Sequence, residues 1–151
     1  MAIKQITIFI ENRAGRLLEI TQLLADNKID LRALNIAEPT DYGLLRIIVD
    51  DTNKALEVLK ENGAIATTTD VLAVAVPNVP GGLNTLLQVL ATANVDVSYM
   101  YSIFGHADEN AYMILQLNNA DEVAELLDKN GILQRFQPMP TCLALSFEYY
   151  G

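Results

Sequence analysis

The chain repeats itself at an offset of 66 residues, and this self-similarity constrains its fold more than any other feature. The offset pairs residues of the same type along the first part of each copy: Asn12/Asn78, Gly15/Gly81, Leu17/Leu83, Gln22/Gln88, Leu24/Leu90, Ala25/Ala91 and Asp30/Asp96. After a shift of two residues, further pairs follow: Glu57/Glu125, Leu59/Leu127, Asn62/Asn130 and Gly63/Gly131. A fixed period of this kind indicates a repeated structural unit, so we predict two copies of about 70 residues each.

Each copy shows the same order of hydrophobic patterns. Residues 4–10 alternate with a period of two and predict a strand, and apolar residues at helical spacing follow, namely Leu17, Ile20 and Leu24 in the first copy and Leu83, Leu86, Leu87 and Leu90 in the second. The first copy continues with predicted strands at 30–37, 43–49 and 64–69 and a helix at 52–61. In the second copy we predict strands at 71–76, 96–104, 111–117 and 133–137 and helices at 82–93 and 121–129.

This order is βαββαβ twice, which predicts an α+β protein of two ferredoxin-like units. We place one unit at residues 1–70 and the other at 71–151, with an extra C-terminal strand at 141–149. We expect antiparallel sheets side by side, with the helices on one face, and docked units because the junction Thr67–Asp70 is rich in β-branched residues rather than Gly and Ser. Thr52 or Asn53 is the expected cap of the helix at 52–61, and Asn62–Gly63 its end.

Composition excludes several classes of function. The net charge of −9 disfavours binding to nucleic acid or to an anionic membrane surface. Cys142 and His106 are the only residues of their types, so neither a disulfide framework nor a metal site is expected, and no cofactor is implied. No signal peptide or membrane-spanning apolar run is present, which predicts a soluble, cytoplasmic protein. We interpret His106 as a turn residue and Cys142 as a buried strand thiol.

Three repeated pairs lie at element ends rather than in the predicted core: Asn12/Asn78, Gly15/Gly81 and Asp30/Asp96. A glycine at a strand-to-helix turn exposes the first N–H groups of the helix, which suit a carboxylate. An Asn before the turn offers a donor and an acceptor, and an Asp after the helix accepts hydrogen bonds from an ammonium group. A free amino acid requires this combination. Ordinary helix-cap and turn chemistry explains the same residues, and both interpretations stay open.

The segment Glu11–Leu17 followed by Lys28–Leu31 resembles an ACT domain, a small regulatory module of amino-acid metabolism, and Pro77–Leu83 followed by Asn94–Val97 resembles a second one. The resemblance implies a stand-alone, non-catalytic tandem that binds an amino acid at an interface between units and regulates allosterically. In such modules the strand-to-helix loop of one unit and the residues after the first helix of another contact the ligand.

Carried over by position, the resemblance identifies the ligand-binding residues as Asn12, Arg13, Ala14, Gly15, Asp30 and Leu31 in the first copy and Asn78, Pro80, Gly81, Asp96 and Val97 in the second. This sequence departs from the family pattern at Ala14, where the second copy has the commoner Pro80, and at both Asp positions, which are often Asn. The positions of Arg13 and Arg16 are occupied by Val79 and Gly82 in the second copy, so we expect the two sites to differ in charge and in ligand.

Two other classes of function compete with an amino-acid sensor. Three acidic pairs are candidates for acid–base catalysis, but adjacent side chains do not converge on one substrate, which favours structural roles: Asp50–Asp51, Asp108–Glu109 and Asp121–Glu122. An interaction module that regulates a partner enzyme without a small ligand stays open. We expect a homodimer, formed through the helices or the strand at 141–149, and an enzyme of amino-acid metabolism as a further partner.

Overall fold

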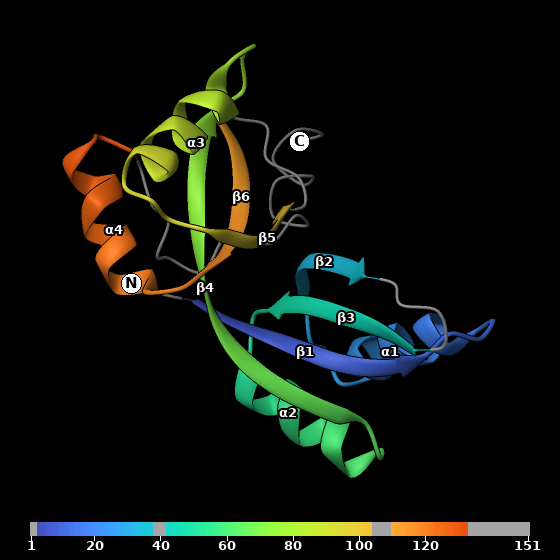
Figure 1. The fold of residues 1–151 in the computed structure, drawn as a ribbon. Helices are drawn as coiled ribbons and strands as arrows, with labels where there is room; N and C mark the ends of the chain where they lie inside the picture. The colour runs from blue at the N-terminus through green and yellow to red at the C-terminus, as the bar shows by residue number, and fades with distance from the viewer. Residues whose placement is uncertain (1–2, 38–41, 104–109, 133–151) are drawn as a thin grey trace, which may run out of the picture. The chain divides into compact units, whose positions relative to one another are not determined.

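The computed structural model describes residues 3–37, 42–103 and 110–132. Its elements follow the predicted order (Figure 1): β1 Ile3–Glu11, α1 Arg16–Asp26, β2 Leu31–Ala37, β3 Tyr42–Val49, α2 Thr52–Glu61, β4 Ile65–Pro77, α3 Gly82–Thr92, β5 Val97–Ser102, β6 Asn110–Leu117 and α4 Ala120–Lys129. The α+β class is therefore confirmed. The strands predicted at 133–137 and 141–149, as well as His106, Cys142 and the acidic pair at 108–109, lie outside the described residues.

The chain divides into two compact units, Lys4–Thr69 and Asp70–Gly151 together with Met1–Ile3, called here the N-terminal and C-terminal units. Strand order is β2-β3-β1-β4-β6-β5. In the N-terminal unit β3 pairs antiparallel with β1 and with β2. In the C-terminal unit β6 pairs antiparallel with β4 and with β5. The order β2-β3-β1-β4 is that of a ferredoxin-like sheet, which the βαββαβ pattern predicts.

In the N-terminal unit, α1 and α2 cover one sheet face. Alternate residues of β1 point into this core (Ile6, Ile8 and Ile10), and they meet Ile20 and Leu24 of α1 and Ala55 and Leu59 of α2. Because strand side chains alternate between faces while the helical stripe recurs every three or four residues, the two periods read from the sequence identify the same core.

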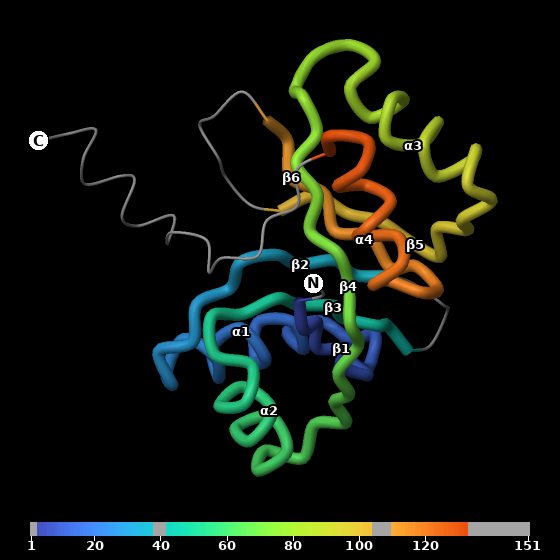
Figure 2. Tube along the Cα trace, turned by 90° about the vertical axis from the view of Figure 1, so that its left-hand side faces the viewer, coloured from blue at the N-terminus to red at the C-terminus, as the bar shows by residue number. Residues whose placement is uncertain are grey.

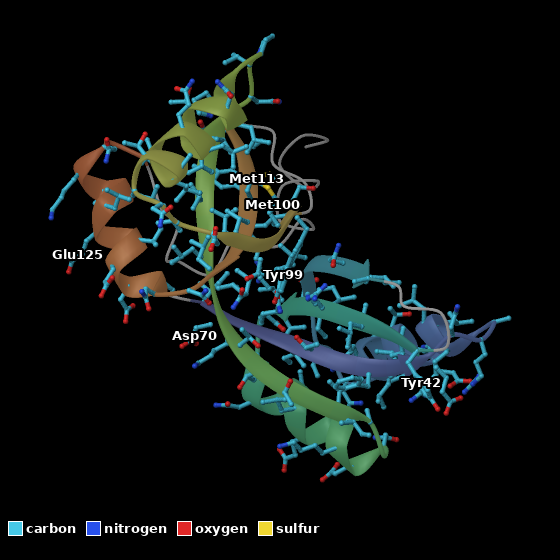
Figure 3. The ribbon with its side chains drawn as sticks, viewed as in Figure 1. Tyr42, Asp70, Tyr99, Met100, Met113 and Glu125 are labelled. Atoms are coloured by element: carbon cyan, nitrogen blue, oxygen red, sulfur yellow. The ribbon has the colours of Figure 1, made fainter. Side chains whose placement is uncertain are left out.

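The C-terminal unit repeats this arrangement. Leu72, Val74 and Val76 of β4 alternate into a core that also contains Leu86 and Leu90 of α3 and Val123 and Leu127 of α4. On β5, the rings of Tyr99 and Tyr101 stack with centroids 6.5 Å apart. Met100 lies between them in sequence and packs against the helix-covered core together with Met113 of β6 (Figure 3). The tyrosines are therefore sheet-packing residues, as their alternation predicts.

One prediction about the strands was wrong, because residues 64–69 and 71–76 form a single strand. β4 runs without a break from Ile65 to Pro77 (Figures 1 and 2), and the boundary between the two units falls inside it, after Thr69. No glycine or proline occurs from Ile65 to Val76, and the three threonines before Asp70 favour extended backbone, so nothing interrupts the strand.

The repeat is visible in the backbone hydrogen bonds at the helix ends. After α1, Lys28 N–H donates to the Ala25 carbonyl and Ile29 N–H to the Leu24 carbonyl; after α3, Asn94 and Val95 make the same bonds to Ala91 and Leu90. Such paired bonds define a Schellman motif. Lys28 and Asn94 adopt the left-handed conformation without being glycines, with φ of 57° and 56°. These two positions were not predicted, because conformational propensity assigns the left-handed role to glycine.

Two details of the predicted helices are corrected. Asp51, not Thr52 or Asn53, caps α2, and its side chain accepts a hydrogen bond from Lys54 N–H at 3.0 Å. On α3, Leu86 and Leu90 are buried, whereas Leu83 and Leu87 are exposed by 39% and 36%. Leu87 follows the buried Leu86 by one residue, about 100° around the helix, which turns it out of the core. The predicted end of α2 is confirmed, since Gly63 has φ of 79°.

Leu24→Ala is expected to lower the free energy of unfolding by about 2–5 kcal/mol, because this side chain is 1% exposed in the N-terminal core. Leu18→Ala on the same helix is the matched control, since Leu18 is 66% exposed, and it should cost about 0.5 kcal/mol or less. Chemical denaturation of both variants measures the difference. Equal losses would contradict the assigned core face of α1.

Candidate functional site

The strand-to-helix loops of the two units share one backbone construction. Arg13 N–H donates to the Glu11 carbonyl at 2.9 Å, and Val79 N–H donates to the Pro77 carbonyl at the same distance. The glycine before each helix is left-handed, with φ of 84° at Gly15 and 87° at Gly81. No heavy atom comes within 4 Å of a Cβ built on either glycine, so the backbone conformation and not crowding requires glycine here.

Both helices that follow these loops begin without a side-chain cap. Gly15 and Gly81 occupy the N-cap positions of α1 and α3, and neither helix has a capping side-chain hydrogen bond. Asn12 and Asn78 are exposed, and their side chains make no hydrogen bond in the described part of the chain. The interpretation of these asparagines as caps is therefore wrong. Ala14 and Pro80, between the asparagine and the glycine, are exposed as well.

The candidate aspartates lie at the opposite end of the same helices. Asp30 and Asp96 follow α1 and α3, each 11 residues long, so about 16 Å of helix separates them from Gly15 and Gly81 of their own unit. A single unit therefore does not bring its loop and its aspartate to one small ligand. Next to them, Leu31 and Val97 start β2 and β5 and pack against the two cores, which gives both a structural role.

Asp30 already makes a backbone hydrogen bond and an ion pair within the protein. Its N–H donates to Asp50 Oδ1 at 3.0 Å, and its Oδ2 lies 3.2 Å from Arg32 Nε. The Arg32 side chain is 13% exposed, and its Nε and Nη1 find no hydrogen-bond partner among the described residues. Arg32 therefore holds the Asp30 carboxylate by charge attraction, and that carboxylate is poorly placed to receive a ligand's ammonium group.

Asp96 has no comparable partner. Ser98 occupies the position that Arg32 has in the first copy, and the exposed Asp96 side chain makes neither an ion pair nor a hydrogen bond within the described ranges. It lines a cavity of about 300 Å³ together with Glu122 and with polar residues at the ends of α3 and α4, namely Asn94, Asn118 and Asn119. Two carboxylates with no cation among the described lining residues create a negative site that suits an ammonium group.

The N-terminal loop carries a network of ion pairs that its repeat lacks. Both Nη atoms of Arg13 donate to the Glu19 carboxylate, at 3.0 and 2.9 Å, while its Nε donates to Glu11 and Arg16 Nη1 also reaches Glu19 at 3.0 Å. The hydrogen bonds from Arg13 and then Arg16 lower the pKa of Glu19, and those to Glu19 and Glu11 raise the pKa of Arg13. Both arginines stand out in the sequence, whereas Glu19 was not predicted, although its three-residue spacing from Arg16 indicates an ion pair.

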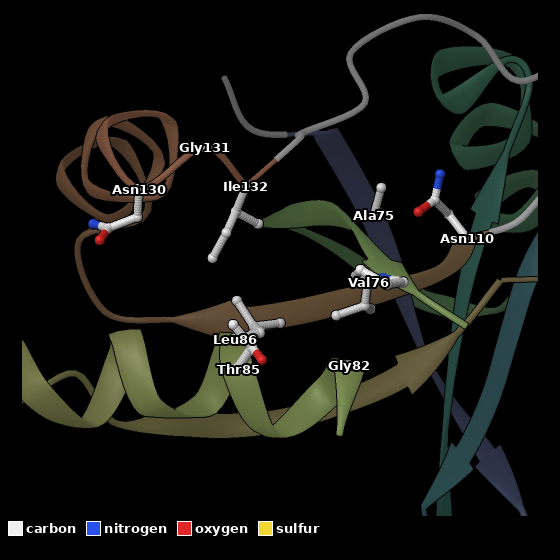
Figure 4. A pocket seen from close by; sticks show the side chains of 10 residues that line it. Ala75, Val76, Gly82, Thr85, Leu86, Asn110, Asn130, Gly131 and Ile132 are labelled. Carbon is white, nitrogen blue, oxygen red and sulfur yellow. The ribbon is translucent and has the colours of Figure 1, made fainter. Parts of the chain in front are cut away.

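At the equivalent place, the C-terminal unit has a cavity of about 260 Å³ (Figure 4). Four elements contribute to it: Ala75, Val76 and Pro77 from β4, Gly82, Thr85 and Leu86 from α3, Asn110 from β6, and Asn130, Gly131 and Ile132 at the end of α4. This cavity was not predicted from the sequence. The sequence feature that could have indicated it is the presence of two small, uncharged residues, Gly82 and Thr85, where the first copy has Arg16 and Glu19.

Residues 1–135 match the model of the ACT domain pair family, so the chain belongs to this family. A solved protein from Bacteroides thetaiotaomicron is 41% identical, with a TM-score of 0.82 over 89% of this chain and 93% of the other. The ligand-free regulatory subunit of aspartate kinase from Thermus thermophilus is 19% identical, with a TM-score of 0.62 over 83% and 91% of the two chains. Its counterpart from Thermus flavus is 17% identical, with a TM-score of 0.60 over 83% and 90%.

These comparisons establish the tandem ACT fold. No curated protein matches the chain. Among the described residues, no three His, Cys, Asp or Glu side chains gather as a potential metal site. No helix in the ranges 3–37, 42–103 and 110–132 combines the length and the apolar character needed to cross a membrane.

We expect the Glu19 carboxyl group to titrate below its ordinary value of 4.5, because its charged form accepts hydrogen bonds from two arginines. A lowered native pKa contributes stability that is present above pH 4.5 and is lost as the pH falls through the native value. Carboxyl-detected NMR titration measures this midpoint. Arg13→Gln should move it upward while leaving the fold intact, and an unchanged midpoint in that variant would show that Arg13 is not the principal partner.

Proposed function

We propose that this protein is a cytoplasmic, non-catalytic regulator that binds a free amino acid. One observation carries the proposal: the same exposed helix start is built twice, with a left-handed glycine, no side-chain cap, and an asparagine whose side chain has no partner in the described part of the chain. Uncapped N–H groups and the positive end of the helix dipole favour a carboxylate, and the asparagine adds a donor and an acceptor.

The ammonium group of the ligand is assigned to the aspartates that follow the first helix of each unit. Asp96 is exposed and beside Glu122, whereas the Asp30 carboxylate is held by Arg32. Binding an ammonium group at Asp30 would require competition with a nearly buried guanidinium, which is less favourable than binding at an unpaired carboxylate. We therefore assign the principal ammonium contact to Asp96 and a lesser one to Asp30.

A regulatory rather than catalytic role agrees with the acidic pairs of the described region. Asp50 Oδ1 accepts hydrogen bonds from the N–H groups of Asp30 and Asp51, and Asp51 caps α2. Asp121 and Glu122 occupy the first turn of α4, where the helix dipole stabilises negative charge. Because solved proteins of this fold include regulatory subunits of aspartate kinase, we propose an enzyme of amino-acid metabolism as the partner whose activity the ligand controls.

A second candidate function, self-association or partner binding without a ligand, is favoured by the surface of α3. Val79, Leu83 and Leu87 are exposed by 62%, 39% and 36% and recur at four-residue spacing. Residues 71–95 contain no charged side chain in a chain whose net charge is −9. Two such chains repel one another, so contact through the uncharged helix is the least costly way to associate. We propose that this surface forms a two-fold homodimer.

A melt of the protein against the twenty amino acids tests ligand binding. An amino acid present at about 100 times its dissociation constant adds about 2.7 kcal/mol of stability, which corresponds to roughly 5–10 °C in melting temperature. We expect one chemical group of amino acids to produce this shift. A panel in which every amino acid leaves the melting temperature unchanged would reject the sensor and favour the ligand-free interaction module.

The same assay assigns the ammonium contact. Asp96→Ala should weaken binding by at least tenfold, and Asp30→Ala, the matched control in the other copy, should weaken it less. Asp96→Ala removes an exposed, unpaired carboxylate, so loss of folding is not expected from it. Asp30→Ala leaves Arg32 without its anion and should lower stability, so circular dichroism establishes the fold of both variants. Equal affinity of wild type and Asp96→Ala would remove this residue from the site.

Disruption of the α3 surface tests the homodimer. Leu83→Glu combined with Leu87→Glu should convert the dimer into a monomer of 16.6 kDa, because two like charges then face their symmetry mates. Leu18→Glu on α1 is the control, since Leu18 is an even more exposed leucine, at 66%, on a helix with charged neighbours. Light scattering coupled to size-exclusion chromatography measures the mass. A monomeric wild type, or a dimer that survives the double substitution, contradicts the proposed interface.

A further inference from the structure

The cavity of about 260 Å³ in the C-terminal unit reaches the apolar interior of that unit (Figure 4). Val76 and Leu86, exposed by 3% and 1%, form part of its wall. Ile132 adds a further aliphatic side chain at the end of α4, and Pro77 one at the end of β4. Specific small-molecule sites are concave and mostly apolar with a few placed polar groups, and this cavity has that composition.

The polar side chains of the cavity are uncharged, and two of them donate hydrogen bonds to backbone carbonyls. Thr85 Oγ1 donates to the Gly81 carbonyl at 3.2 Å, and Asn130 Nδ2 donates to the Leu126 carbonyl at 2.8 Å. None of the described lining residues carries a charge. A charged ligand group that entered here would lose its hydration without gaining a counter-ion, which is strongly unfavourable.

The first copy has charged side chains at the equivalent positions. Arg16 stands where the second copy has Gly82, and its side chain is 23% exposed with a buried Nε. Glu19 stands in place of Thr85 and binds both Arg13 and Arg16. The two units therefore differ here in charge: the N-terminal unit lines its own cavity of about 360 Å³ with Arg16 and Glu19, whereas the described lining of the C-terminal cavity is uncharged.

Glycine at position 82 is required by the local packing of the C-terminal unit. A Cβ atom on Gly82 would overlap the carbonyl oxygen of Pro77, so this position accepts no side chain in the observed backbone. Pro77 and Gly82 both line the cavity, and between them in the chain lies the loop that carries Asn78 and Gly81. The cavity is thus adjacent in the structure to the loop assigned to ligand binding.

We infer that this cavity receives the side chain of the bound amino acid, and that the ligand is therefore one with a small, uncharged aliphatic side chain such as valine, leucine or isoleucine. The inference rests on the proposed amino-acid binding. It adds the chemical class of the ligand and assigns recognition of the ligand's side chain to the C-terminal unit. The volume lies just below the usual range for drug-sized ligands, about 300–1,000 Å³, which agrees with a small molecule.

Two substitutions on α3 test the inference by calorimetric titration of the full chain with valine, leucine, isoleucine, aspartate, glutamate, lysine and arginine. Thr85→Phe places a large side chain at the cavity, whereas Thr92→Phe places the same side chain at the far end of the helix. Both threonines are exposed and donate a hydroxyl bond to the carbonyl four residues earlier. We expect an aliphatic amino acid to bind the wild type, Thr85→Phe to weaken it at least tenfold, and Thr92→Phe to leave it within about twofold.

Thr85→Glu, which copies Glu19 of the first repeat, provides a second variant if Thr85→Phe fails to fold, and it should also weaken binding at least tenfold. Circular dichroism establishes the fold of each variant. Selective binding of a charged amino acid, or unchanged affinity for an aliphatic one in the folded cavity variants, would overturn the inference while the proposed function stands. If none of the twenty amino acids in the melt described above binds, the proposed function fails as well.

Discussion

Burial of one sheet face under two helices is the constraint on which each unit depends. Ile8 and Leu24 in one copy, and Val74 and Leu90 in the other, are at most 1% exposed because the helices lie across the strands. A chain that leaves a strand and returns across it as a helix must reverse direction within a few residues. The left-handed conformations of Gly15 and Gly81 before the helices, and of Lys28 and Asn94 after them, make these reversals possible. Backbone N–H and C=O groups are consequently exposed at helix ends, and the candidate ligand-binding residues gather there rather than over the core.

The two copies are similar in backbone conformation but differ in the charge of several side chains. Their loops, helix ends and even the irregularities at the start of β2 and β5 recur at the same offset. Three side chains at the first helix end do not recur, because Arg13, Arg16 and Glu19 in the first copy correspond in sequence to Val79, Gly82 and Thr85 in the second. A duplicated unit retains the residues that its backbone needs, while positions around a ligand are free to diverge. The charged lining in one copy and the uncharged lining in the other agree with the proposal that the second copy selects the ligand's side chain.

Element order and most of the core could be predicted from periodicity, and the duplicated pattern made the prediction secure. The exceptions depend on tertiary context. β4 is one strand because neither half contains a residue that breaks it, although the repeat suggested a junction at Thr67–Asp70. Leu87 has the spacing of a core residue, but Leu86 and Leu90 already fill the space above the sheet. The loop asparagines and glycines were found from the repeat, whereas the cavity beside them was not, because a cavity is defined by the walls of four separated elements and by side chains that are missing.

Charge pairing also distinguishes the two equivalent aspartates. Asp30 and Asp96 occupy the same place in the backbone, yet Arg32 neutralises the first and Ser98 leaves the second uncompensated. A nearly buried guanidinium is stable only beside an anion, so Asp30 cannot release Arg32 to a ligand without leaving a desolvated charge behind. Asp96 is not paired with a cation in the described part of the chain. Together with Glu122 it forms a negative site about 16 Å along α3 from the Gly81 loop. One small zwitterion cannot span that helix, so Asp96 and the Gly81 loop of the same unit cannot both contact it.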